Sequence, residues 1–212
     1  MTTVAWQLDD HTDYAYEGAI FSTGSAVQWL RDGLGIIGSA AETEPLARSV
    51  PSTDDVYFVP AFTGLGSPWW DPYARGTIIG VTRGTTRAHL ARAVVEAMAF
   101  QTRDVVEAMA DAAGRPVAAL RADGGASVMD LLLELQADQL GVPVARPVVQ
   151  ETTALGAAYL AGLAEGVWGS LDELAGQWAL DIEVEPSPDR APADAAHQRW
   201  LAAVGRSRDW SG

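Results

Sequence analysis

The stretch from Leu120 to Leu140 constrains the fold more than any other part of the sequence. It reads as a short strand, a tight turn on Asp123-Gly124-Gly125, and then a helix from Val128 to Leu140 with an apolar face. Glycines between a strand and a helix let a ligand approach the backbone, and the free N–H groups and helix dipole attract negative charge. The stretch therefore predicts either an anion or nucleotide site or an ordinary turn, and the rest of the chain must decide between them.

Strand and helix patterns alternate along the rest of the chain, which is typical of an α/β fold. A loop rich in glycine, proline and aromatic residues, 61–76, is too irregular for a helix or strand and is expected to be functional or interfacial. The regular elements are expected as a hairpin of Thr3–Leu8 and Tyr14–Ile20, a short helix after Ser22 or Thr23, strands at 56–60, 77–81 and 141–144, and helices at 87–113, 154–164 and 193–210.

Three further expectations concern burial and domain organisation. The polar residues within 87–113 read as a solvated face, and the helix at 154–164, built largely of small residues, is expected to pack closely against another element. The acidic, proline-containing segment 181–192 reads as a linker. The chain is therefore divided into a domain at 1–180, a linker at 181–192 and an amphipathic C-terminal helix at 193–212.

Composition excludes several classes of function. A net charge of −14 opposes binding to a nucleic-acid backbone. No apolar run approaches the roughly 20 residues needed to span a membrane, and the N-terminus lacks the pattern of a signal peptide, so the cytoplasm is the expected location. The absence of cysteine removes thiolate chemistry, and the absence of lysine removes a phosphate-binding loop of the Walker type. The dispersed histidines do not form a metal-binding pattern, and no metal ligand is predicted.

Four groups of motifs, taken together, resemble the C-terminal half of the glycerol kinases, which are FGGY carbohydrate kinases of the actin-like ATPase superfamily. The resemblance covers nearly the whole chain and is specific only as a combination. The motifs are Tyr14-Ala15-Tyr16-Glu17-Gly18 leading to Gln28-Trp29-Leu30-Arg31-Asp32, the run from Val59 to Gly66 leading to Trp70–Gly76, Gln101-Thr102-Arg103-Asp104 before Asp123-Gly124-Gly125-Ala126, and the run from Thr152 to Gly162.

The resemblance implies a ribonuclease-H-like domain, incomplete at its N-terminal strands, that holds ATP or ADP for transfer of the γ-phosphoryl group, with Mg²⁺, to glycerol. The nucleotide contacts carried over from the family fall on Gly24, Gln28, Gly125 and Met129. Each glycine is expected at the mouth of a helix, with its partner side chain one turn deeper, so that two helix N-termini clasp the nucleotide. The family normally has asparagine at the place of Met129, and loss of that hydrogen bond should cost about 0.5–1.5 kcal/mol of nucleotide affinity.

The resemblance also implies that the catalytic aspartate, the polyol-binding residues and the first phosphate loop lie in an N-terminal half, so no catalytic residue is assigned to this sequence. Alone, the chain is then expected to be inactive. Two alternatives stay open: a non-catalytic module that pairs with a partner chain or another copy of itself, and another FGGY kinase such as a xylulokinase.

Overall fold

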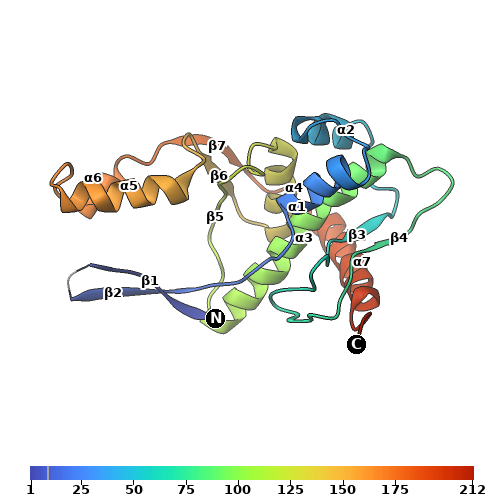
Figure 1. The fold of residues 1–212 in the computed structure, drawn as a ribbon, viewed down its shortest axis with the longest axis horizontal. Coiled ribbons are helices and arrows are strands. Elements are labelled where there is room, and N and C mark those ends of the chain that lie inside the picture. Colours follow the sequence, from blue (N-terminus) through green and yellow to red (C-terminus); the bar gives the residue numbers. More distant parts are fainter. Residues whose placement is uncertain (9) are drawn as a thin grey trace.

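Helix α3 (Arg87–Ala113) runs through the middle of the computed structural model, which describes residues 1–8 and 10–212 (Figure 1). Thr86 and His89 form a capping box at its start, and Gly114 ends it in the left-handed conformation at φ +64°. Both ends lie where the sequence predicts them.

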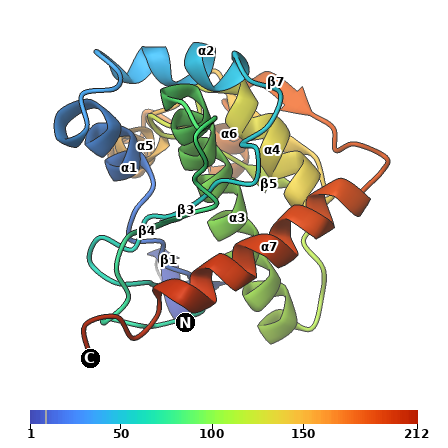
Figure 2. The same cartoon turned by 90° about the vertical axis from the view of Figure 1, so that its right-hand side faces the viewer.

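The main core surrounds the N-terminal part of α3. It contains side chains from α1 (Gly24–Gln28), β3 (Tyr57–Val59), α4 (Asp130–Leu140) and α7 (Ala191–Ser207). Helix α2 (Thr43–Arg48) covers one end of α3, and α7 crosses α3 on another side (Figure 2). Trp200 of α7 is fully buried and stacks on Phe100 of α3 with ring centroids 5.3 Å apart, so the C-terminal helix is an integral part of the core.

The strands form three small sheets within the described residues. β1 (Thr2–Leu8) and β2 (His11–Tyr16) make the expected hairpin, although β2 starts and ends earlier than predicted; the predicted turn includes residue 9, which lies outside the described residues. β3 pairs with β4 (Thr77–Ile79) across the long loop. The third sheet has the order β5 (Leu120–Arg121), β6 (Val144–Pro147), β7 (Leu180–Val184), with β5 parallel and β7 antiparallel to β6.

The segment predicted as a linker, 181–192, differs from the prediction at both ends. Its first residues belong to β7, and its last residues begin helix α7. Residues 180–184 form a strand because they hydrogen-bond to β6, and the local sequence gives no information on this pairing.

The prediction of a solvated polar face on α3 is wrong for Gln101, Arg103 and Asp104, which are all buried. The Asp104 carboxylate lies 2.7 Å from Nε2 of His197 and accepts a hydrogen bond of 2.8 Å from Nε1 of Trp200. Helix α7 supplies these partners, which is why a carboxylate is tolerated in the interior.

Two arms extend from the core on the same side in Figure 1: the hairpin β1–β2, and α5 (Thr152–Ala164) with α6 (Leu171–Ala175). The expectation that α5 packs closely against another element holds only locally: Gly162 is buried against the ring of Trp168, which Tyr159 also contacts edge-on with centroids 5.1 Å apart, whereas no other residue of this helix is buried. None of the helices in the described part of the chain is both long and apolar enough to cross a membrane.

Candidate functional site

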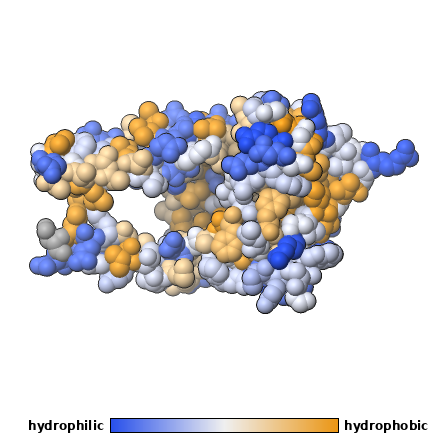
Figure 3. Space-filling model, in the orientation of Figure 1, coloured by the Kyte–Doolittle hydropathy of each residue, from blue (hydrophilic) through white to orange (hydrophobic). Residues whose placement is uncertain are grey.

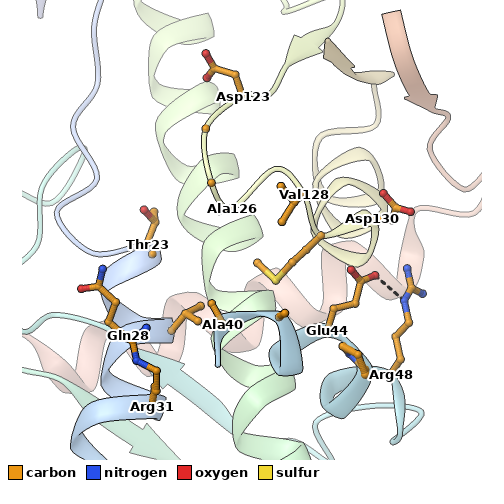
Figure 4. A pocket seen from close by; sticks show the side chains of 17 residues that line it. Thr23, Gln28, Arg31, Ala40, Glu44, Arg48, Asp123, Ala126, Val128 and Asp130 are labelled. Carbon is orange, nitrogen blue, oxygen red and sulfur yellow. Dashed lines mark hydrogen bonds and ion pairs between the residues drawn. The ribbon is translucent and has the colours of Figure 1, made fainter. Parts of the chain in front are cut away.

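A cavity of about 1040 Å³ lies between α1, α2 and the glycine turn that precedes α4 (Figure 4). All four residues singled out from the sequence line it: Gly24, Gln28, Gly125 and Met129. They come from two segments about a hundred residues apart, so the fold brings the two halves of the predicted site together.

The turn at Gly124 and Gly125 presents bare backbone to this cavity. Gly124 has a φ of +77°, which favours glycine, and its N–H donates to the carbonyl of Gln150. A Cβ atom added to Gly125 or to Gly24 would meet nothing within 4 Å. In the described part of the chain, no group accepts a hydrogen bond from the N–H of Gly125 or Ala126. The turn therefore combines space with donors, as an anion or nucleotide site requires.

The predicted arrangement of Gly125 at a helix mouth is wrong. Helix α4 begins only at Asp130, so Gly125 lies in the preceding turn, and Met129 is the N-cap residue rather than a side chain one turn inside the helix. Met129 is buried, at 7% exposure, and belongs to the main core. Turn residues separate the glycines from the start of α4. The apolar periodicity of the sequence gave no sign of this separation.

A carboxylate of the protein occupies the start of α4. Oε1 of Glu44, on α2, accepts a hydrogen bond of 2.9 Å from the backbone N–H of Leu131 and another of 2.8 Å from Nε of Arg48. A negative charge at this position satisfies the helix dipole from within the protein. An anion at the glycine turn would therefore depend on the turn's own N–H groups rather than on the N-terminus of α4.

Gln28 lies on the opposite side of the cavity from this turn (Figure 4). Gly24 is the first residue of α1, as predicted, and Gln28 is the last. Gln28 is exposed, and no described residue shares a hydrogen bond with its side chain. Its amide is free to donate to and accept from a ligand in the cavity.

The cationic side chains of the cavity already have partners. Arg31 pairs with Asp32 at 2.7 Å, and Arg48 pairs with Glu44 and Glu134, each at 2.8 Å. Hydrogen bonding to Glu134 and then to Glu44 raises the pKa of Arg48. In residues 1–8 and 10–212 there is no group of three or more acidic, histidine or cysteine side chains that could hold a metal ion.

One wall of the cavity, formed by α2 and by the short 3-10 helix Ala40–Glu42 before it, was not predicted from the sequence. Its lining residues come from a segment that reads as a polar loop with a small helix, and no spacing marks them as part of a site. They are Ala40, Ala41, Glu44, Pro45 and Arg48. Alanine and proline make this wall partly apolar, opposite the exposed glycine backbone.

Comparison with known proteins identifies the family. The sequence profile of the "FGGY family of carbohydrate kinases, C-terminal domain" matches residues 2–165. The chain belongs to this family. It is 58% identical over 210 residues to glycerol kinase 2 of Thermotoga maritima and 57% identical over 210 residues to the glycerol kinase of Deinococcus radiodurans. Each match covers 99% of this chain and 42% of the relative, so the chain spans less than half of the length of these FGGY kinases.

Solved structures of FGGY kinases share the fold. The glycerol kinase of Plasmodium falciparum, solved with ADP, superimposes with a TM-score of 0.88 at 32% identity, covering 98% of this chain and 42% of that one. The xylulose kinase of Rhodospirillum rubrum superimposes with a TM-score of 0.75 at 29% identity, covering 91% and 40%. The prediction of an actin-like, FGGY-type C-terminal domain is therefore confirmed.

Proposed function

We propose that this chain is the nucleotide-binding C-terminal part of a glycerol kinase, which holds ATP or ADP in the cavity between α1, α2 and the glycine turn. The observation that carries the proposal is the meeting of Gly24, Gln28 and Gly125 around one cavity with free backbone donors. A cavity of about 1040 Å³ is large enough for a nucleotide.

The chemistry of the two walls supports one orientation of the ligand. The phosphates face the bare backbone at Gly24 and Gly125, where N–H groups can donate without a lysine. The base faces the partly apolar wall of Ala40, Pro45 and the Met129 side chain. This division explains how a chain with a net charge of −14 can bind an anion, because short-range donors act inside the screening length of the distant charges.

Magnesium is proposed to arrive with the nucleotide. Since no described cluster of side chains could hold the ion, its ligands would be phosphate oxygens, water and groups outside this sequence. When bound, Mg²⁺ would neutralise charge on the transferred phosphoryl group. No catalytic base or polyol-binding residue is assigned to this chain, and we propose that it is inactive alone. The proposed cellular location is the cytoplasm.

Glycerol is the proposed acceptor rather than a pentulose. The support is the identity of 58% to a glycerol kinase, and a TM-score of 0.88 with a glycerol kinase structure against 0.75 with a xylulose kinase structure. The other alternative is a non-catalytic module that pairs with another chain. No feature of the cavity supports it separately.

Nucleotide binding can be tested by isothermal titration of the purified chain with ADP, without glycerol. We expect saturable binding that Gln28→Ala weakens about fivefold, because one or two hydrogen bonds are lost. Arg83→Ala, an exposed change remote from the cavity, serves as the matched control and should leave the affinity unchanged. Absence of binding at millimolar ADP by a folded wild-type chain would reject the proposal.

A further inference from the structure

Arg146, on β6, connects the third sheet to the glycine turn that borders the cavity. Its side chain is buried and is not part of the cavity lining. Its Nη1 donates to the backbone carbonyl of Ser127 at 2.8 Å and to Oδ1 of Asp130 at 2.9 Å. Its Nε and Nη2 bind Oδ2 of Asp181, on β7, at 2.8 and 2.7 Å. The planar guanidinium group therefore joins β7 to the turn and to the first residue of α4.

Ser127 transmits this contact to the rest of the turn. Its backbone N–H and its hydroxyl group both donate to the carbonyl of Gly124, at 3.0 and 2.7 Å. The carbonyl groups of Gly124 and Ser127 are thus bound within the protein. The N–H groups of Gly125 and Ala126, between them, have no acceptor among the described residues. Arg146 therefore supports a conformation of the turn in which two donors stay free for a ligand.

A second contact of the turn comes from a less enclosed segment. The N–H of Gly124 donates to the carbonyl of Gln150 at 2.8 Å. Gln150 lies just before α5, at the root of an arm that is separated from the hairpin arm by an opening (Figure 3). Arg146, in contrast, belongs to the middle strand of the third sheet and is buried. The more rigid of these two supports is therefore the one from Arg146.

Arg146 also offsets a negative charge at the edge of the cavity. Asp130 is one of the lining residues, and its side chain is 50% exposed (Figure 4). An unpaired carboxylate at this place would repel the phosphates of a nucleotide. The ion pair with Arg146 at 2.9 Å reduces that repulsion.

We propose that Arg146 is a positioning residue for the nucleotide site. It holds the turn 123–127 in the conformation that leaves the N–H groups of Gly125 and Ala126 free, and it pairs with the carboxylate of Asp130. This proposal rests on the proposed function, ADP or ATP binding in this cavity, and adds to it a residue that does not line the cavity.

The test is isothermal titration of the Arg146→Lys chain with ADP, together with hydrogen exchange of the turn measured without nucleotide. Lysine keeps the positive charge but cannot bind Ser127 and Asp181 at once through a planar group. We expect the dissociation constant for ADP to rise about tenfold. The amides of residues 123–129 should exchange at least about fivefold faster than in the natural chain.

Arg103→Lys is the matched control. Arg103 is as buried as Arg146, at 9% exposure, and binds Glu107 and Asp194 at 2.7 and 2.8 Å. Neither Arg103 nor these two partners line the cavity. The control should lower the unfolding midpoint to a similar extent, while the ADP affinity stays within about twofold of that of the natural chain.

A milder variant covers the case in which Arg146→Lys does not fold. Asp181→Asn weakens the anchor of Arg146 on β7 but leaves the guanidinium group in place. It should raise the dissociation constant for ADP about threefold.

The outcomes separate the two proposals. A folded natural chain that binds no ADP would reject the proposed function, and the positioning role with it. If the natural chain binds ADP, the positioning role alone is overturned by unchanged affinity in the folded Arg146→Lys chain or, where that chain does not fold, in Asp181→Asn. Equal losses of affinity in Arg146→Lys and Arg103→Lys, or weaker binding without faster exchange in the turn, would also overturn it.

Discussion

Glu44 and Leu131 join α2 to α4 beside the cavity proposed to hold the nucleotide, although they are 87 positions apart in the sequence. The carboxylate of Glu44 accepts the N–H of Leu131 at 2.9 Å and so caps α4 from α2. The same carboxylate is held by Arg48, whose other carboxylate partner is Glu134 on α4. These contacts tie α2, which carries the partly apolar wall, to α4, which follows the glycine turn.

Replacing Glu44 with alanine should therefore loosen the cavity. We expect Glu44→Ala to lower the free energy of unfolding by about 1 kcal/mol, as loss of a helix cap does, and to weaken ADP binding. Glu44→Gln keeps an oxygen acceptor for the N–H of Leu131, so it should retain most of the stability and most of the ADP affinity. Urea unfolding and ADP titration of the two variants measure these effects, and equal losses in both variants would contradict a capping role.

The two glycines of the turn should respond differently to alanine. Gly125 does not have a positive φ, and a methyl group added to it would enter open space, so Gly125→Ala should leave the free energy of unfolding unchanged. The same methyl group would enter the space proposed for the ligand, so the affinity for ADP should fall about tenfold. Gly124→Ala should cost about 1 kcal/mol of stability, because its φ is +77°. Thermal unfolding and titration of both variants separate backbone strain from ligand contact.

Met129 offers a test of the residue-level resemblance. Met129→Asn should tighten ADP binding about three- to tenfold by restoring a hydrogen-bonding side chain, and should lower stability because Met129 is part of the core. Met129→Leu preserves apolar volume and should leave ADP affinity close to that of the natural chain. An asparagine variant that folds but binds no more tightly than the leucine variant would show that this position does not contact the nucleotide.

The buried Asp104 should be one of the most sensitive positions for stability. Asp104→Ala removes the partner of both His197 and Trp200 in the interior and should cost about 3 kcal/mol. Asp104→Asn keeps the shape and one acceptor, so its cost should be smaller. Chemical unfolding followed by tryptophan fluorescence measures the free energy of unfolding of both variants. A decrease of less than about 1 kcal/mol for the alanine variant would refute the proposed importance of this network.

Asp71 should make stability depend on acidity. Backbone N–H donation from Asp209, and also from Tyr73 and Ala74, lowers the pKa of its carboxyl group. The charged form is therefore favoured by folding, so its contribution is present above the unfolded-state pKa of about 4 and is lost as pH falls below that value. Unfolding midpoints from pH 7 to pH 3 should fall less steeply for Asp71→Asn, whereas Asp111→Asn, an exposed control, should follow the natural chain.

Local signals in the sequence were sufficient for much of the fold, whereas the four residues assigned to the site came from the resemblance to the FGGY kinases. Thr86 and Gly114 delimit α3 because caps act within one helical turn, and a glycine turn after a strand marks a place where backbone is accessible. The start of α4 was misjudged because apolar periodicity continues through the turn that precedes it. The wall from α2 was missed because alanine, proline and glutamate carry no pattern specific to a binding site.

By itself, the sequence determined the α/β order of elements and the ends of the long helix. Through its resemblance to a family, it also named the family and four residues that line one cavity. Only the tertiary structure decided which charges are buried, where the segment 180–184 pairs, and that Glu44 rather than a ligand occupies the start of α4. The physical reason is range: caps and turns depend on neighbours along the chain, whereas Asp104 and His197 are 93 positions apart and acquire their roles only when packing brings them within 2.7 Å.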